Sequence, residues 1–275
     1  MAFNQDILSE NKAYWTQRAP TYSEVNQAEL STQSRKIWRH TLCGQIRSHF
    51  TDRPPQELRT LEVGTGPGFF AIILAEVGYR VTAVDLTPNM LAEAKKNAGA
   101  LADEIEFLEM NAEALTFADD TFDVIVSRNL TWNLPHPENA YREWRRVLKP
   151  GELLLIFDAN WYHYLYDETA LTGYEEDRKN TAERGIRDEN IGENFDVMEY
   201  IARRIPLSRI VRPAWDKRVL SGIGFDVETD EHIWERVWTE EEKLNFASTP
   251  MFLIRAIKRE ALPDRLEAQA PSELP

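Results

Sequence analysis

The chain has 275 residues, which suits one large α/β domain or one domain with a sizeable insertion. Hydrophobic residues make up 43% of the sequence, so an intrinsically disordered chain is excluded. The formal net charge is -14, and a surface this acidic repels phosphate backbones, so we expect no nucleic-acid partner.

The first 55 residues are predicted to be helical, and the pair Pro54-Pro55 ends this region. From Arg59 onward, strand-like and helix-like segments alternate, which predicts a parallel, doubly wound sheet with helices on both faces. The five strands predicted here are 60–63, 80–84, 105–109, 122–127 and 152–158. The helices predicted between them are 69–77, ended by Gly78; 88–98, with Thr87 as its cap; and 137–148, followed by a turn at Lys149-Pro150-Gly151.

The regular alternation stops after the fifth strand. Residues 160–211 are rich in charged and aromatic side chains and carry no clear strand, so they are predicted to be an insertion. A helix from Pro213 to near Gly222 and two strands, around 225–228 and 251–257, are predicted to follow. The polar residues 259–275 are predicted to be a flexible tail.

The cysteine content and the hydropathy indicate the compartment. Cys43 is the single cysteine and cannot form an internal disulfide, which suits a reducing cytoplasm. The N-terminus has no apolar core of signal-peptide length, and no run of about 18 apolar residues occurs, so we expect no membrane span. The histidines show no ligand pairing at helical spacing, so we expect no metal site.

The strongest functional signal is the glycine-rich segment 61–69, LEVGTGPGF, which joins the first strand to a helix. Glycines there allow a sharp turn and let a ligand approach the backbone closely. The spacing differs from the G-x-G-x-x-G of dinucleotide enzymes, because Phe69 stands where their third glycine would be. No Gly-Lys-Ser/Thr follows, which excludes a Walker loop. A carboxylate at Asp85, the end of the second strand, can accept hydrogen bonds from both hydroxyls of a ribose.

These segments resemble the cofactor-binding motifs of class I S-adenosylmethionine (SAM)-dependent methyltransferases. From about Trp15 to Lys258 the chain is most similar to the small-molecule group that includes the ubiquinone and menaquinone biosynthesis enzymes. Residues 14–22, YWTQRAPTY, resemble the segment that closes over SAM in that group, and 148–152, LKPGE, resemble the turn before their fifth strand.

The resemblance implies a Rossmann-like, mostly parallel sheet of seven strands whose last strand is antiparallel. It also implies SAM as the cofactor and S-adenosylhomocysteine as its product. The domain organisation we expect is an N-terminal helical cap at 1–55, a methyltransferase domain at 56–258 and a tail at 259–275. The insertion at 160–211 is predicted to form a second part of the cap, over the acceptor side of the pocket.

The resemblance and the strand ends together give the candidate site. An acidic residue near position 111 is expected to bind the adenine amino group, and this chain has Asn111, which can still accept that bond. The predicted cofactor-binding residues are Tyr22, Glu62, Gly64, Thr65, Gly66, Gly68, Asp85, Leu86, Met90, Asn111, Ala112, Glu113, Arg128 and Asn129. The predicted acceptor-binding residues are the aromatic group Trp15, Trp132, Trp161, Tyr162 and His163. His163 and Tyr22 are candidate catalytic residues, with an ordinary structural role as the alternative for each.

The predicted function is transfer of the SAM methyl group to a small-molecule acceptor by in-line displacement. Two alternatives stay open: a methyltransferase acting on a protein or RNA, and a SAM-binding protein without transfer activity. The sequence does not identify the acceptor atom, and it is compatible with either a monomer or a homodimer.

Overall fold

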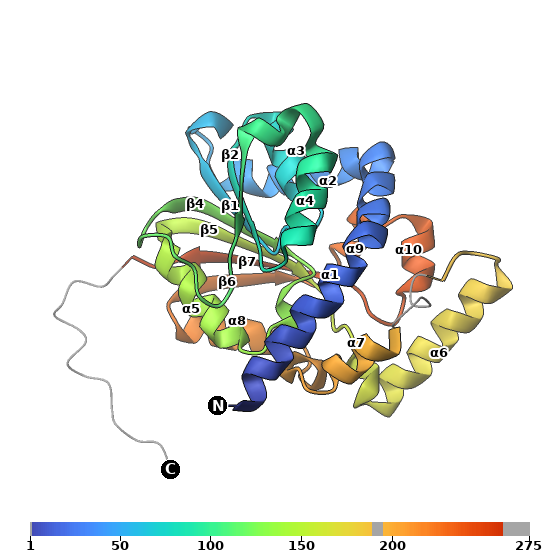
Figure 1. The fold of residues 1–275 in the computed structure, drawn as a ribbon. Helices are drawn as coiled ribbons and strands as arrows, with labels where there is room; N and C mark the ends of the chain where they lie inside the picture. The colour runs from blue at the N-terminus through green and yellow to red at the C-terminus, as the bar shows by residue number, and fades with distance from the viewer. Residues whose placement is uncertain (1, 189–194, 261–275) are drawn as a thin grey trace, which may run out of the picture.

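The computed structural model describes residues 2–188 and 195–260 (Figure 1). Its centre is one seven-stranded sheet with the strand order β3-β2-β1-β4-β5-β7-β6. The first five strands pair in parallel, and β7 runs antiparallel to both of its neighbours. The strands are β1 Arg59–Val63, β2 Arg80–Asp85, β3 Ile105–Glu109, β4 Phe122–Arg128, β5 Leu148–Asp158, β6 Phe225–Asp230 and β7 Phe252–Lys258. The predicted Rossmann-like sheet with an antiparallel last strand is confirmed.

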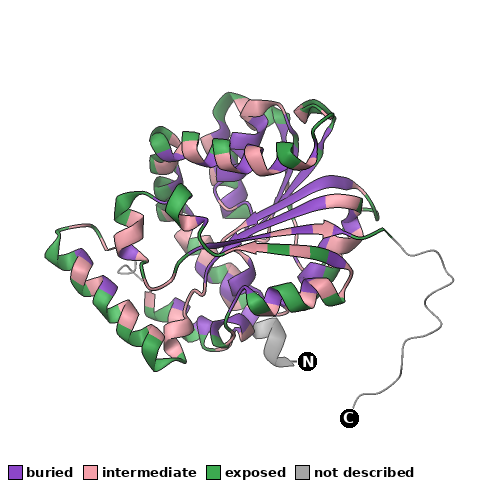
Figure 2. Ribbon diagram, turned by 180° about the vertical axis from the view of Figure 1, so that it is seen from behind, coloured by how far each residue is buried: buried purple, intermediate pink, exposed green. Residues whose placement is uncertain are grey.

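Helices cover both faces of the sheet, because successive strand residues point to opposite sides. In β4, Val124 and Val126 pack with α2, α3 and α4, whereas Ile125 packs with α5 and α8 on the other face. The central strands β1, β4 and β5 are therefore mostly buried, whereas the edge strands β3 and β6 also carry exposed residues (Figure 2). The helices are α1 Ala2–Ser31, α2 Gln33–His49, α3 Phe69–Val77, α4 Pro88–Ala98, α5 Pro137–Val147, α6 Glu168–Glu183, α7 Phe195–Ala202, α8 Ala214–Gly222, α9 Trp234–Val237 and α10 Glu240–Asn245.

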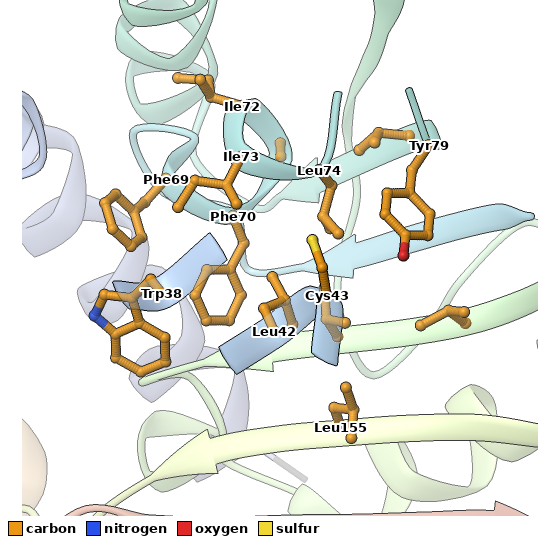
Figure 3. Close-up of a cluster of buried hydrophobic side chains, with 14 of the residues drawn as sticks. Trp38, Leu42, Cys43, Phe69, Phe70, Ile72, Ile73, Leu74, Tyr79 and Leu155 are labelled. Carbon is orange, nitrogen blue, oxygen red and sulfur yellow. The ribbon is translucent and has the colours of Figure 1, made fainter. Parts of the chain in front are cut away.

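An aromatic cluster joins the N-terminal helices to the sheet. Trp38 of α2 is fully buried, and its ring centroid lies 5.2 Å from that of Phe70 and 5.3 Å from that of Phe157. Figure 3 shows Trp38 and Leu42 of α2 facing Phe69 and Phe70 of α3. Because α3 packs against α2 as well as against the sheet, its residues 69–75 are all buried, which explains why these positions are apolar.

The structure departs from the predicted elements in three places. β5 begins at Leu148, so the predicted turn at 149–151 is a bulge within one strand: Phe122 pairs with Leu148, but Val124 pairs with Leu153. Thr87 precedes α4 without a side-chain capping bond. The short helices α9 and α10 occupy a segment for which no element was predicted. Of the predicted tail, residues 261–275 lie outside the described residues. No helix in the described part of the chain is long and apolar enough to cross a membrane.

Candidate functional site

The glycine loop after β1 is shaped so that only glycine fits at its first position. Gly64 has φ +72°, and a Cβ there would lie 2.7 Å from the Leu130 side chain. Gly66 also has positive φ, at +50°. The backbone N–H groups of Gly64 and Thr65 both donate to the Val84 carbonyl, at 2.9 and 3.0 Å. The loop therefore lies tightly across the ends of β1 and β2 and presents its backbone to the pocket.

Asp85 connects the glycine loop to the start of α4. Its Oδ2 accepts a hydrogen bond from Gly66 N at 2.9 Å, and its Oδ1 accepts one from Thr87 N at 2.9 Å. Burial raises the pKa of Asp85, and these backbone bonds oppose that rise. Each oxygen keeps a second lone pair. The carboxylate can therefore hold the loop and accept two ribose hydroxyl groups at the same time.

Glu62 is a buried carboxyl group beneath the loop. Its Oε2 accepts bonds from the Thr65 hydroxyl at 2.6 Å and from Ala71 N at 2.8 Å. Burial raises the pKa of Glu62 to about 8, so the carboxyl is mostly protonated at neutral pH. Both of these bonds go to Oε2, which leaves Oε1 to interact with a ligand. A cationic group of a ligand beside Oε1 would favour the ionised form of Glu62.

Arg128, at the carboxyl end of β4, fixes α1 to the sheet. Its guanidinium donates to both carboxylate oxygens of Glu29, at 3.2 and 2.6 Å. The same group lies 4.7 Å from the centroid of the Trp38 ring and 4.8 Å from that of Phe69. The ion pair and the two aromatic faces hold Arg128 rigidly beside the glycine loop.

These groups line one cavity at the carboxyl ends of β1, β2, β3 and β4, where open α/β sheets bind ligands. One face of α1 covers it. The predicted site residues that line the cavity are Trp15, Tyr22, Glu62, Gly64, Thr65, Gly66, Asp85, Leu86, Met90, Asn111, Ala112, Arg128 and Asn129. Gly68 is not among them: a Cβ there would lie 3.1 Å from that of Ala94, so the residue permits close packing of α3 against α4. Glu113 also lies outside the lining and accepts a hydrogen bond from His136 N at 2.6 Å.

Four predicted acceptor-binding residues do not line the cavity. Trp132 donates from Nε1 to the Asn129 carbonyl at 3.0 Å, and its ring centroid lies 5.1 Å from that of Tyr162. Trp161 packs edge-on against Phe246. His163 contacts the Ser208 carbonyl through Nδ1 at 3.1 Å. Trp132, Trp161 and Tyr162 belong to a hydrophobic cluster with residues of α1 and α7, and contact of the four residues with an acceptor stays a prediction.

A buried ion-pair network supports the turn that follows β4. Arg212 donates to Asp158 Oδ2 at 2.8 Å and to Asp216 Oδ1 at 2.9 Å, and all three side chains have no exposed surface. Asp158 Oδ2 also accepts from Trp132 N at 3.0 Å and from the Thr131 hydroxyl. The network therefore joins the end of the insertion to the ends of β4 and β5.

The sequence reasoning missed the polar face of α1 and most of the turn after β4. The lining also includes Leu8, Asn11, Lys12, Asn26, Leu130, Asn133, Leu134 and Pro135. The α1 members follow the spacing of one helical face: 8, 11, 12 and 15, then 22 and 26. That periodicity was the signal that could have found them. In the part of the chain that the structure describes, no three His, Cys, Asp or Glu side chains are grouped to hold a metal ion.

The chemistry of the lining fits SAM, a cofactor without phosphate that carries many hydrogen-bond donors. Its ribose, adenine amino and ammonium donors match the carboxylates and amide oxygens of Asp85, Asn111 and Glu62. The cofactor can pack directly against the backbone of the tight glycine loop. The first position of the loop is a glycine because a Cβ at Gly64 would collide with Leu130.

Comparison with known proteins agrees with this geometry. A family described as "Methyltransferase domain" matches residues 61–156. Ubiquinone/menaquinone biosynthesis C-methyltransferase UbiE of Roseobacter denitrificans is 33% identical over 143 residues, which cover 51% of this chain and 55% of the relative. The chain thus spans about half the length of the curated relatives it matches.

Solved structures of low sequence identity share the fold. One from Methanococcus maripaludis, whose name proposes an S-adenosyl-L-methionine-dependent methyltransferase, has a TM-score of 0.54 and 21% identity, covering 90% of this chain and 94% of its own. The [4+2]-cyclase SpnF has a TM-score of 0.51 and 18% identity, covering 80% and 81%. Residues 61–156 thus match a methyltransferase domain, and the sheet and the glycine loop agree with SAM as the cofactor of this part of the chain.

Proposed function

We propose that this chain transfers the methyl group of SAM to a small-molecule acceptor bound beneath α1. The observation that carries the proposal is the covered cavity, in which a cofactor site and the inner face of a long helix meet. Lys12 of α1 forms an ion pair with Glu109 at 2.6 Å, and Asn89 donates to the Thr16 carbonyl at 3.3 Å. A pocket covered in this way suits a small molecule better than a segment of a polymer.

Each part of the lining has a role in the proposal. Asp85 accepts the ribose hydroxyls, and Leu86, Met90 and Ala112 enclose the adenine. Asn111 Oδ1 accepts a hydrogen bond from Glu113 N at 2.9 Å. Its second lone pair accepts a hydrogen bond from the adenine amino group. When bound, SAM supplies a methyl group on a sulfonium centre, which a nucleophile displaces in line. The protein orients the two reactants and keeps water out.

The alternative functions have less support. The charge of -14 opposes binding of RNA, although it does not oppose a protein substrate. One structural neighbour is named a [4+2]-cyclase, so this fold alone does not determine the reaction.

The cysteine content supports a cytoplasmic location. Cys43 is buried and is the single cysteine of the sequence, which suits a reducing compartment.

The test has two stages. Calorimetry should first show binding of S-adenosylhomocysteine and no binding of NAD. The protein is then incubated with methyl-labelled SAM and, separately, with the small-molecule, protein and RNA fractions of a bacterial extract. We expect label in the small-molecule fraction. Label confined to protein or RNA would overturn the acceptor class, and SAM binding without transfer to any fraction would favour a binding protein.

A further inference from the structure

A group of asparagines lines the cavity with side-chain oxygens that lack donors. The Oδ1 atoms of Asn11, Asn26, Asn129 and Asn133 are buried and have no hydrogen-bond partner within the described structure. Asn11, Asn26 and Asn133 are only 5, 4 and 8% exposed. Leaving a buried acceptor without a donor destabilises the protein, so these oxygens are expected to meet donors on a ligand.

A hydrogen bond fixes the orientation of the Asn11 amide, and backbone bonds hold the turn that carries Asn129 and Asn133. Asn11 Nδ2 donates to the Asn133 carbonyl at 2.9 Å, so a flipped amide would set two acceptors against each other. The turn that carries Asn129 and Asn133 is held by Asn133 N donating to Leu130 O at 3.0 Å and by Trp132 Nε1 donating to Asn129 O at 3.0 Å. The Asn11 oxygen and the turn that carries Asn129 and Asn133 therefore belong to a preformed wall of the cavity.

The cofactor does not need all of these oxygens. Its ribose, adenine amino and ammonium donors are already assigned to Asp85, Asn111 and Glu62. Asn26 lies one turn before Glu29, the ion-pair partner of Arg128, and so belongs to the methionine end of the cofactor site. Three oxygens are left for a second ligand, those of Asn11, Asn129 and Asn133.

We propose that Asn11, Asn129 and Asn133 form the acceptor subsite and that the acceptor is an amine; this inference rests on the methyl transfer proposed above. Donors on an amine nitrogen match three buried amide oxygens that belong to the lining of one cavity. The apolar part of the lining near these residues, Leu8, Trp15, Leu130 and Leu134, suits an amine with an apolar body.

The protonation chemistry of the lining favours nitrogen over carbon or oxygen. Within the described lining there is no histidine; its titratable residues are Lys12, Tyr22, Glu62, Asp85 and Arg128. Lys12 and Arg128 are ion-paired cations, and the two carboxyl groups hold the glycine loop. Tyr22 is a phenol, which at neutral pH donates rather than accepts a proton. A carbon or hydroxyl acceptor must lose a proton to a base during transfer.

An amine needs no base in this step. Its neutral nitrogen uses its lone pair to form the new N–C bond as the S–C bond breaks, and the electrons of that bond stay on sulfur, giving a neutral thioether. The positive charge moves from sulfur to nitrogen. The product leaves as an ammonium ion that still carries its proton, which water takes afterwards.

The first experiment identifies the atom that is methylated. Wild-type protein is incubated with SAM carrying a ¹³C-methyl group and with the pooled small molecules of a bacterial extract, and products are examined by NMR. A labelled methyl group on nitrogen, whose shift titrates with the amine, is the expected result. A labelled methyl group on carbon, oxygen or sulfur overturns the proposal. Absence of any labelled product contradicts the proposed function instead.

The second experiment tests the subsite with the purified acceptor. Asn133→Leu keeps the branched arrangement of side-chain heavy atoms and removes the oxygen, and we expect its KM for the acceptor to rise at least tenfold while its affinity for S-adenosylhomocysteine changes less than threefold. Asn133→Asp keeps an acceptor oxygen and should restore the KM to within threefold. Asn139→Leu, on the exposed surface of α5, is the matched control. The subsite assignment is wrong if Asn133→Leu weakens binding of S-adenosylhomocysteine as much as it weakens binding of the acceptor. It is also wrong if Asn133→Asp folds normally but does not restore the KM for the acceptor.

Discussion

The buried carboxyl group of Glu62 should make cofactor binding release a proton. Burial raises its pKa to about 8, so the free protein carries about 0.9 proton there at pH 7. The ammonium of the bound cofactor favours the carboxylate and should return the pKa of Glu62 to its ordinary acidic range. Binding of S-adenosylhomocysteine should then release about 0.9 proton at pH 7, about 0.5 at pH 8 and about 0.1 at pH 9.

The sign of the effect on affinity follows from the same linkage. Because the bound state holds fewer protons than the free state, affinity should rise with pH, by nearly tenfold from pH 6 to pH 7, and level off above pH 8. Calorimetry in two buffers with different ionisation enthalpies measures the number of protons released. Glu62→Gln keeps an oxygen acceptor but cannot titrate, so its release should fall to zero.

Glu113→Gln is the matched control for this measurement. Burial also raises the pKa of Glu113, but this residue lies outside the cavity lining, so its substitution should leave the proton release unchanged. Two results would refute the reasoning: a release by Glu62→Gln equal to that of the wild type, or a wild-type release that does not change between pH 7 and pH 9.

Three further predictions use binding and unfolding measurements. Asp85→Ala removes the expected ribose acceptor and both bonds to the loop, so calorimetry should show binding of S-adenosylhomocysteine weakened by roughly 1.5–3 kcal/mol; an unchanged dissociation constant would contradict the ribose assignment. Gly64→Ala should weaken binding of S-adenosylhomocysteine, because the residue has φ +72° and its Cβ would meet Leu130. Adding Leu130→Ala removes the collision but not the backbone strain, so it should restore only part of the affinity. Full restoration would show that the positive φ is unimportant. Arg212→Met leaves two buried carboxylates unpaired and should lower the free energy of unfolding in urea by about 3–5 kcal/mol; a loss below about 1 kcal/mol would show that the network contributes little.

The sheet could be predicted from the sequence because its signals are local. Each of the first five strands is a short segment with several apolar residues. Glycine or proline lies next to several of the strand ends. The glycine loop and Asp85 could be located for the same reason, since each directly follows a strand. The helix α10 also had a local signal, the capping box in which Thr239 and Glu242 bond to each other's backbone, and the sequence analysis did not use it.

The acceptor side could not be predicted in this way, because contacts distant in sequence create it. Asn11 meets Asn133 across 122 positions. The aromatic run after β5 suggested a wall of the pocket, yet burial of Trp161 and Tyr162 is satisfied by packing behind it. Thr87 stands where a capping residue belongs, but its side chain makes no capping bond; its backbone N–H donates to Asp85 Oδ1 and its carbonyl accepts from Met90 N, an arrangement that residue type alone does not reveal.

The insertion still shapes the cavity, through α1. A buried cluster joins Ile7 and Tyr14 of α1 to Met198 and Ile201 of α7, and Figure 1 shows α7 beside the N-terminal half of α1. An ion pair between Arg204 and Glu10 adds to the same contact. Three of the six α1 residues that line the cavity, Asn11, Lys12 and Asn26, are polar, so the contacts of α1 with α7 add to the packing that holds the helix over the cavity. The cavity wall and part of its support therefore come from different faces of one helix, and we expect the insertion to influence access to the cavity through α1.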